Sequence, residues 1–189
     1  STSQSPGLFV SNQAYVVPGL GSEMEVKGTM AFQAELISGS ILSPVGFDQD
    51  PLYGVGQLGV LDPSSGWLFA LMETNTRIYG LYSRLPLAVT PINDYVSFAY
   101  LVPIAVREPH SSNQLSIVLN RSHFSVSYRV EGIERMYVER VGRPLDERFL
   151  LDDNGGIIQC MGFPESIYMI FGTGMLPSTG NPYTACQAR

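Results

Sequence analysis

The chain is divided into short stretches in which apolar and polar residues alternate, and this pattern constrains its fold more than any other feature. The stretches are rich in Val, Ile, Tyr, Phe and Thr, and turns of Pro, Gly, Asn, Asp and Ser separate them. Such a pattern is typical of half-buried β-strands. No long stretch has the period of an amphipathic helix, and the best helical candidate, 143–151, is short and contains Pro144. We expect strands at 7–11, 15–17, 24–36, 57–61, 67–73, 76–85, 95–106, 114–120, 123–131 and 133–141, with further candidates at 157–161 and 166–173.

The length and the strand pattern together predict one all-β domain over residues 1–189. Pro and Gly are scattered along the chain, and no internal repeat or central linker divides it. Two stacked antiparallel sheets in a jelly-roll (concanavalin-like) sandwich fit this strand content best, and a closed β-barrel is the second choice.

Turn chemistry and alternation also predict which side chains face the core. We expect a Pro-led turn at 62–66 and tight hairpins at 120–122 and 131–132. In the stretch 123–131, the side predicted to face the core carries Phe124, Val126, Tyr128 and Val130. The opposite side, which we expect to face solvent, carries His123, Ser125, Ser127, Arg129 and Glu131.

The charge balance excludes some partners. Eleven basic residues against seventeen acidic ones give a net charge of −6, so the chain lacks the basic surface that nucleic acid requires. The apolar runs are too short to cross a bilayer, so no membrane insertion is expected. Arginines do gather late in the chain, but acidic residues interleave with them, which indicates a solvated, mutually neutralised face. These arginines are Arg129, Arg135, Arg140, Arg143 and Arg148.

Metal, cofactor and redox signals are weak. The oxygen-rich segments 48–50 and 152–156 could bind calcium, but their residues are equally typical of turns, and we expect neither a metal nor a cofactor. Cys160 and Cys186 could form a disulfide or remain two free thiols. The localisation is left open between secreted and cytoplasmic.

Several segments resemble an uncharacterised domain family of bacteria and fungi. The most specific is 74–86, which matches the pattern TNxR(I/V)YxxYxRLP; 94–107, 141–145, 150–156 and 160–162 also match. The family in turn resembles concanavalin-like jelly rolls, which implies that fold. It has no settled activity, so the resemblance implies no reaction.

Known hydrolytic chemistry is not favoured. A retaining glycosidase needs two carboxylates about 5 Å apart, and the nearest pair with suitable spacing is Glu23 and Glu25. Lys27 lies on the same stretch, so a solvated strand face explains this pair as well.

The stretches 76–85 and 95–106 carry large side chains on both faces, so they are predicted to be central strands, and one face could line a cleft. In that cleft Glu73, Arg77 and Tyr79 are the candidate catalytic residues: a buried carboxylate for proton transfer, and a guanidinium for a developing anion. The candidate substrate-binding residues are Trp67, Tyr82, Arg84, Asp94, Tyr95 and Tyr100. Each could instead be an ordinary core residue.

Two functions from different classes follow. The favoured hypothesis is a protein that encloses a hydrophobic small molecule and guides a cofactor-independent cyclisation or isomerisation of a natural-product intermediate. The alternative is a non-catalytic carbohydrate-binding (lectin-like) module, which predicts exposed aromatic platforms with polar rims on a shallow face. A homodimer through an edge strand is also possible in principle.

Overall fold

The computed structural model describes residues 23–37, 46, 48–51, 55–85, 97–153 and 162–172, and the backbone alone of 13–14, 154 and 173–174. The predicted strands at 7–11, 15–17 and 157–161 lie outside the described residues, as do Asp94, Tyr95, Cys160 and Cys186.

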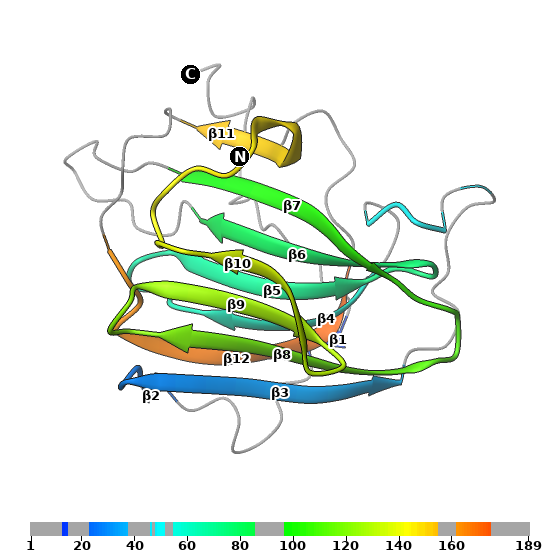
Figure 1. Ribbon diagram of the computed structural model, residues 1–189, viewed down its shortest axis with the longest axis horizontal. Helices are drawn as coiled ribbons and strands as arrows, with labels where there is room; N and C mark the ends of the chain where they lie inside the picture. The colour runs from blue at the N-terminus through cyan, green and yellow to red at the C-terminus, as the bar shows by residue number, and fades with distance from the viewer. Residues whose placement is uncertain are drawn as a thin grey trace, which may run out of the picture.

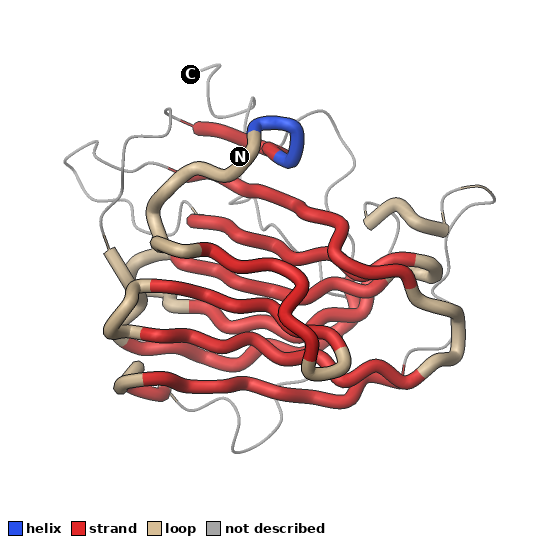
Figure 2. Tube along the Cα trace, viewed as in Figure 1, coloured by secondary structure: helices blue, strands red, loops and turns tan. Residues whose placement is uncertain are grey.

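The described residues form strands and one turn of 3-10 helix, η1 (Figure 2). The elements are β1 (Gln13–Ala14), β2 (Met24–Glu25), β3 (Thr29–Ile37), β4 (Val55–Leu61), β5 (Trp67–Glu73), β6 (Arg77–Arg84), β7 (Ser97–Val106), β8 (Ser112–Asn120), β9 (Ser125–Val130), β10 (Ile133–Val138), η1 (Glu147–Phe149), β11 (Leu150–Asn154) and β12 (Ser166–Gly174). No helix in this described part of the chain is long and apolar enough to cross a membrane.

Two antiparallel sheets face each other (Figure 1). The larger has 8 strands in the order β1-β12-β4-β5-β6-β7-β11, with β2 also paired to β12; the smaller has 4 strands in the order β10-β9-β8-β3. Among the described strands no pairing joins one sheet to the other. The predicted all-β sandwich of jelly-roll type is therefore confirmed, and the fold is not a closed barrel.

The segment 143–151, the best helical candidate in the sequence, is helical over only one short turn. Only Glu147–Phe149 turn helically, beginning where the Asp146 side chain accepts a hydrogen bond from the Arg148 N–H. Leu150–Asn154 instead form the edge strand β11, paired with β7. This pairing is a tertiary contact that local sequence cannot show. It also places residues 152–154 of the oxygen-rich segment 152–156 in a strand.

Aromatic rings fill the space between the sheets. On the inner face of the large sheet, the Tyr82 ring stacks on Trp67 at 5.9 Å, on Phe69 at 6.1 Å and on Tyr100 at 6.0 Å between centroids. The small sheet covers this row with the buried side chains of Leu115, Ile117, Leu119, Val126 and Tyr128. The outer face of the large sheet is also apolar and buried, at Val55, Leu68, Ala70, Met72, Leu81, Leu85 and Ala99. The prediction of strands buried on both faces is therefore correct for most of β6 and for the first four residues of β7, whereas the rest of β7 is half-buried or exposed.

A buried ion pair closes one end of the inner face. The Arg107 guanidinium lies 3.5 Å from the Glu73 carboxylate, and both side chains are fully buried. Arg107 Nη1 also donates to the Thr74 carbonyl at 2.8 Å, and its backbone N–H donates to the Thr76 carbonyl. The pair therefore fastens the end of β7 to the turn between β5 and β6.

We expect the Glu73→Gln variant to lose about 3–5 kcal/mol of unfolding free energy, because it leaves the Arg107 cation buried without its counter-ion. Urea denaturation measures this. The double variant Glu73→Leu/Arg107→Met should lose less than the sum of its two single variants, because it leaves no buried charge. Additive losses would contradict the ion pair.

A second buried carboxylate organises the turn between β4 and β5. Asp62 Oδ1 accepts hydrogen bonds from the N–H of Ser64 at 2.8 Å and its hydroxyl at 2.6 Å, and Oδ2 accepts from the Ser65 hydroxyl at 2.7 Å. Oδ2 also accepts from the Glu165 N–H, which ties the turn to the start of β12. Burial raises the pKa of Asp62, but the hydrogen bonds from Ser64 and Ser65 outweigh it and leave the pKa below the ordinary 3.8.

Because the folded pKa lies below the unfolded one, ionised Asp62 stabilises the protein above about pH 4, and this stabilisation disappears as the pH falls through the folded pKa. We expect Asp62→Asn to lower the unfolding free energy at pH 7 and to lower it less at pH 3. Urea titrations of both proteins at the two pH values measure the difference. A difference of equal size at both pH values would show that the charge has no part in it.

Candidate functional site

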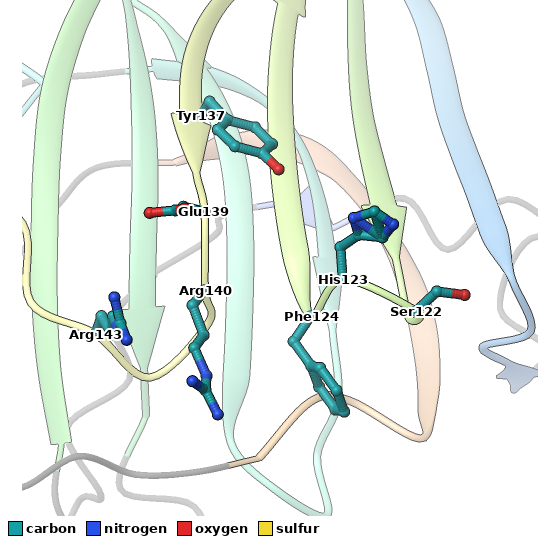
Figure 3. A pocket seen from close by; sticks show the side chains of 7 residues that line it. All are labelled: Ser122, His123, Phe124, Tyr137, Glu139, Arg140 and Arg143. Atoms are coloured by element: carbon teal, nitrogen blue, oxygen red, sulfur yellow. The ribbon is translucent and has the colours of Figure 1, made fainter.

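The candidate site is a hollow at the end of the small sheet where β8 turns into β9 and β10 finishes. It encloses about 440 Å³ and is lined mainly by polar side chains (Figure 3). The lining residues are Ser122, His123, Phe124, Tyr137, Glu139, Arg140 and Arg143.

One wall is the turn between β8 and β9, which is longer than predicted. It spans residues 121–124 instead of 120–122, because Phe124 takes a left-handed backbone conformation with φ of +55°. The backbone N–H of His123 donates to the Asn120 side chain at 3.2 Å, and the Val141 N–H donates to the Phe124 carbonyl at 2.7 Å. The turn is therefore held from both sides.

The prediction that Phe124 faces the core is wrong. Phe124 is 48% exposed, because the left-handed backbone removes it from the alternation of β9, and its ring and the Phe163 ring lie edge-to-face at 5.9 Å between centroids. Ser125 and Ser127, predicted to face solvent, are 4% and 5% exposed. Ser127 donates to the Glu134 side chain on the neighbouring strand, which covers it.

The other wall follows β10. Tyr137 pairs with Ser127 of β9, and its side chain is 48% exposed on the outer face of the small sheet. The segment 139–143 then continues past the strand end. There the Arg143 N–H donates to the Arg140 carbonyl at 3.1 Å, and Gly142 has φ of +98°. Residues 140–143 thus form a β-turn whose third residue needs the freedom of glycine.

This β-turn is anchored on the aromatic core. The Tyr82 hydroxyl accepts a hydrogen bond from the Gly142 N–H at 2.7 Å and donates one to the Arg143 carbonyl at 3.2 Å. Tyr82 is fully buried. Its ring belongs to the stack between the sheets, while its hydroxyl fixes the backbone that carries Arg140 and Arg143.

A second hollow adjoins the first. It encloses about 250 Å³ and is lined mainly by apolar atoms of Phe124, Arg140, Val141 and Gly162. Phe124 and Arg140 line both hollows and extend in the same direction beyond the strand ends in Figure 3. Together the hollows offer a polar surface beside a smaller apolar one.

The three candidate catalytic residues lie on two faces of the large sheet. Glu73 points to the inner face, where it pairs with Arg107. Tyr79 and Arg77 lie against Gln49: the Tyr79 hydroxyl donates to the Gln49 carbonyl at 2.6 Å, and Arg77 Nε donates to its side chain at 3.0 Å. Burial raises the pKa of Tyr79. The structure brings Arg77 and Tyr79 together but separates both from Glu73.

The candidate substrate-binding residues lie mostly in the core. Trp67, Tyr82 and Tyr100 are at most 2% exposed and contact other rings. Arg84 lies over the Trp67 ring at 5.7 Å and donates to the Ser65 carbonyl. The roles assigned to these residues, and to Asp94 and Tyr95, stay predictions.

The carboxylate pair Glu23 and Glu25 lines a third hollow of about 510 Å³ with Arg121, Glu165 and Ser166. Glu25 pairs with Lys27 at 2.8 Å, and Glu23 accepts from the Ser166 hydroxyl at 2.5 Å. Both glutamates are exposed, as a solvated strand face requires. Within the described residues, no three His, Cys, Asp or Glu side chains gather as metal ligands would.

Comparison with known families gives one decisive match. The model of a family of unknown function, DUF6081, matches residues 19–176. The chain belongs to this family. The match confirms the membership in an uncharacterised domain family that the sequence segments suggested. No curated protein matches the chain significantly.

Two solved structures are similar to the DUF6081 chain at a low level. Both are described as the Ruminococcus gnavus IT-sialidase CBM40, one bound to alpha2,6 sialyllactose and one to alpha2,3 sialyllactose. The first is 12% identical with a TM-score of 0.38, covering 90% of this chain and 87% of that one. The second is 12% identical with a TM-score of 0.34, covering 89% and 88%.

Sequence reasoning missed Phe124, Tyr137, Arg140 and Arg143 in this DUF6081 chain. Phe124 fitted the core alternation, and the arginines fitted a neutralised face. One signal was available: a hairpin that turns at 131–132 places residues near 140 opposite residues near 124. That register, extended past the strand ends, predicts the two walls of the hollow.

We expect Tyr82→Phe to destabilise the DUF6081 chain by about 1–3 kcal/mol, because it leaves the buried Gly142 N–H without its acceptor. Hydrogen exchange at residues 139–143 should accelerate. Tyr128→Phe is the matched control, since its hydroxyl donates to the Leu81 carbonyl at 2.8 Å, away from this turn. Equal exchange at 139–143 in both variants would contradict the anchoring role.

Proposed function

We propose that this protein is a non-catalytic carbohydrate-binding module and that the hollow between the β8–β9 turn and residues 137–143 is its saccharide site. The observation that carries the proposal is the pair of outward-facing aromatic side chains, Tyr137 and Phe124, beside a polar rim. This is the arrangement that the carbohydrate-binding hypothesis predicted from the sequence.

The rim has the chemistry that sugar hydroxyls require. A hydroxyl both donates and accepts hydrogen bonds, and the hollow offers acceptors at Glu139 and donors at Arg143, with Tyr137, His123 and Ser122 able to do either. The exposed rings supply apolar surface for the C–H faces of a sugar. A volume of about 440 Å³ is in the range of small-molecule sites.

The framework around the rim is held in place. Phe124 is fixed by the Val141 N–H, and the 140–143 turn is fixed by the Tyr82 hydroxyl. A site whose backbone is already ordered loses less entropy when it binds a ligand. This supports binding to a shallow surface that offers limited contact area.

The cyclisation hypothesis stays a prediction. The rings expected to line an apolar cleft pack on one another, and the candidate carboxylate Glu73 faces Arg107. No observation in the described part of the chain favours that hypothesis over a binding module. The proposed homodimer likewise stays a prediction.

We expect Tyr137→Ala to weaken binding to the best ligand of a glycan array by about tenfold or more, which corresponds to about 1.4 kcal/mol. Titration calorimetry on the purified chain measures this. Ile133→Ala is the matched control, because Ile133 lies on the same strand and is 54% exposed but is not part of the hollow. Absence of binding to every glycan, or unchanged affinity in Tyr137→Ala, would refute the proposal.

A further inference from the structure

The charge at the hollow differs from the charge of the chain. The whole sequence carries −6, but the described residues that line the hollow include two arginines, Arg140 and Arg143, and one carboxylate, Glu139. A net cationic site on an acidic protein is a feature that a neutral ligand does not require.

The two arginines are held close together by the backbone. They occupy the first and fourth positions of the β-turn closed by the Arg143 N–H and the Arg140 carbonyl, and such positions have Cα atoms less than about 7 Å apart. The turn cannot relax freely, because Gly142 and the Arg143 carbonyl are bonded to the buried Tyr82 hydroxyl.

Arg143 is available to bind such an anion. Its residue is exposed, and no ion pair within the described residues involves its guanidinium. Arg140 is half-buried and reaches both hollows. Guanidinium groups bind carboxylate and sulfate oxygens in a bidentate manner, which gives geometric selectivity as well as charge.

Glu139 helps to set the orientation of the ligand. Its exposed carboxylate repels an anion and accepts hydrogen bonds from hydroxyls. An anionic group would therefore be bound by the arginines, while Glu139 accepts hydrogen bonds from sugar hydroxyls. One hollow thus contains a position for charge and a position for hydroxyls.

We propose that the ligand is an acidic saccharide, whose carboxylate or sulfate is bound by Arg143 together with Arg140. The inference rests on the proposed carbohydrate-binding function and names its ligand class. Because the contact is at the surface, salt screens it: the Debye length falls from about 30 Å at 0.01 M to about 10 Å at 0.1 M ionic strength.

The test uses matched oligosaccharides: galacturonate and glucuronate oligomers, their carboxyl-reduced neutral counterparts, and a sulfated galactose oligomer with its unsulfated form. We expect the purified chain to bind an acidic member at least tenfold more tightly than its neutral counterpart at low salt, with the preference shrinking as salt rises. Comparison of the uronate pairs with the sulfated pair shows whether the site prefers a carboxylate or a sulfate.

Two variants locate the preference. Arg143→Gln should abolish it, and Arg143→Lys should retain part of it, because lysine keeps the charge but not the bidentate geometry. Arg135→Gln is the charge-matched control, since Arg135 is exposed on β10 and does not line the hollow.

The outcomes separate the two proposals. Equal binding of acidic and neutral oligosaccharides, or a preference that survives in Arg143→Gln, overturns the acidic ligand and leaves carbohydrate binding standing. If no oligosaccharide of the panel or of the glycan array binds, both proposals fail.

Discussion

The Tyr82 ring and hydroxyl connect the core of this protein to its surface. The ring stacks with Trp67, Phe69 and Tyr100 across three strands of the large sheet, which the small sheet must cover to exclude water. The hydroxyl, at the end of the same side chain, accepts a hydrogen bond from the Gly142 N–H and donates one to the Arg143 carbonyl in the 140–143 turn. The burial that stabilises the sandwich therefore also determines where Arg140 and Arg143 stand.

The buried charged groups of the large sheet also hold turns in place. Glu73 and Arg107 would each be costly to bury alone, but together they fasten β7 to the β5–β6 turn. Asp62 does the same for the β4–β5 turn and the start of β12 through backbone and hydroxyl donors. A buried carboxylate in a sequence can thus indicate an organised turn as well as a catalytic group, and only its partners distinguish the two.

The candidate site lies where regular pairing ends. β8 and β9 are joined by a turn with a left-handed Phe124, and β10 is followed by a β-turn with a left-handed Gly142. Both irregularities turn side chains out of the strand alternation and towards the same hollow. The regular sheet supplies rigidity, and the irregular ends supply the exposed aromatic rings and guanidinium groups that a polar ligand can contact.

The alternating pattern predicted the strands, because a period of two in apolar residues is typical of a half-buried strand, and most predicted stretches from 24–36 to 166–173 appear nearly in place. It also determined that β6 and β7 are central, since both of their faces carry large side chains. The remaining features depend on tertiary contacts. Whether Trp67, Tyr82 and Tyr100 line a cleft or belong to the core depends on the sheet that packs against them. The partner of Glu73 is Arg107, which lies 34 positions away in the chain. The site itself depends on backbone conformations at Phe124 and Gly142 that alternation cannot reveal, because they occur where the alternation stops.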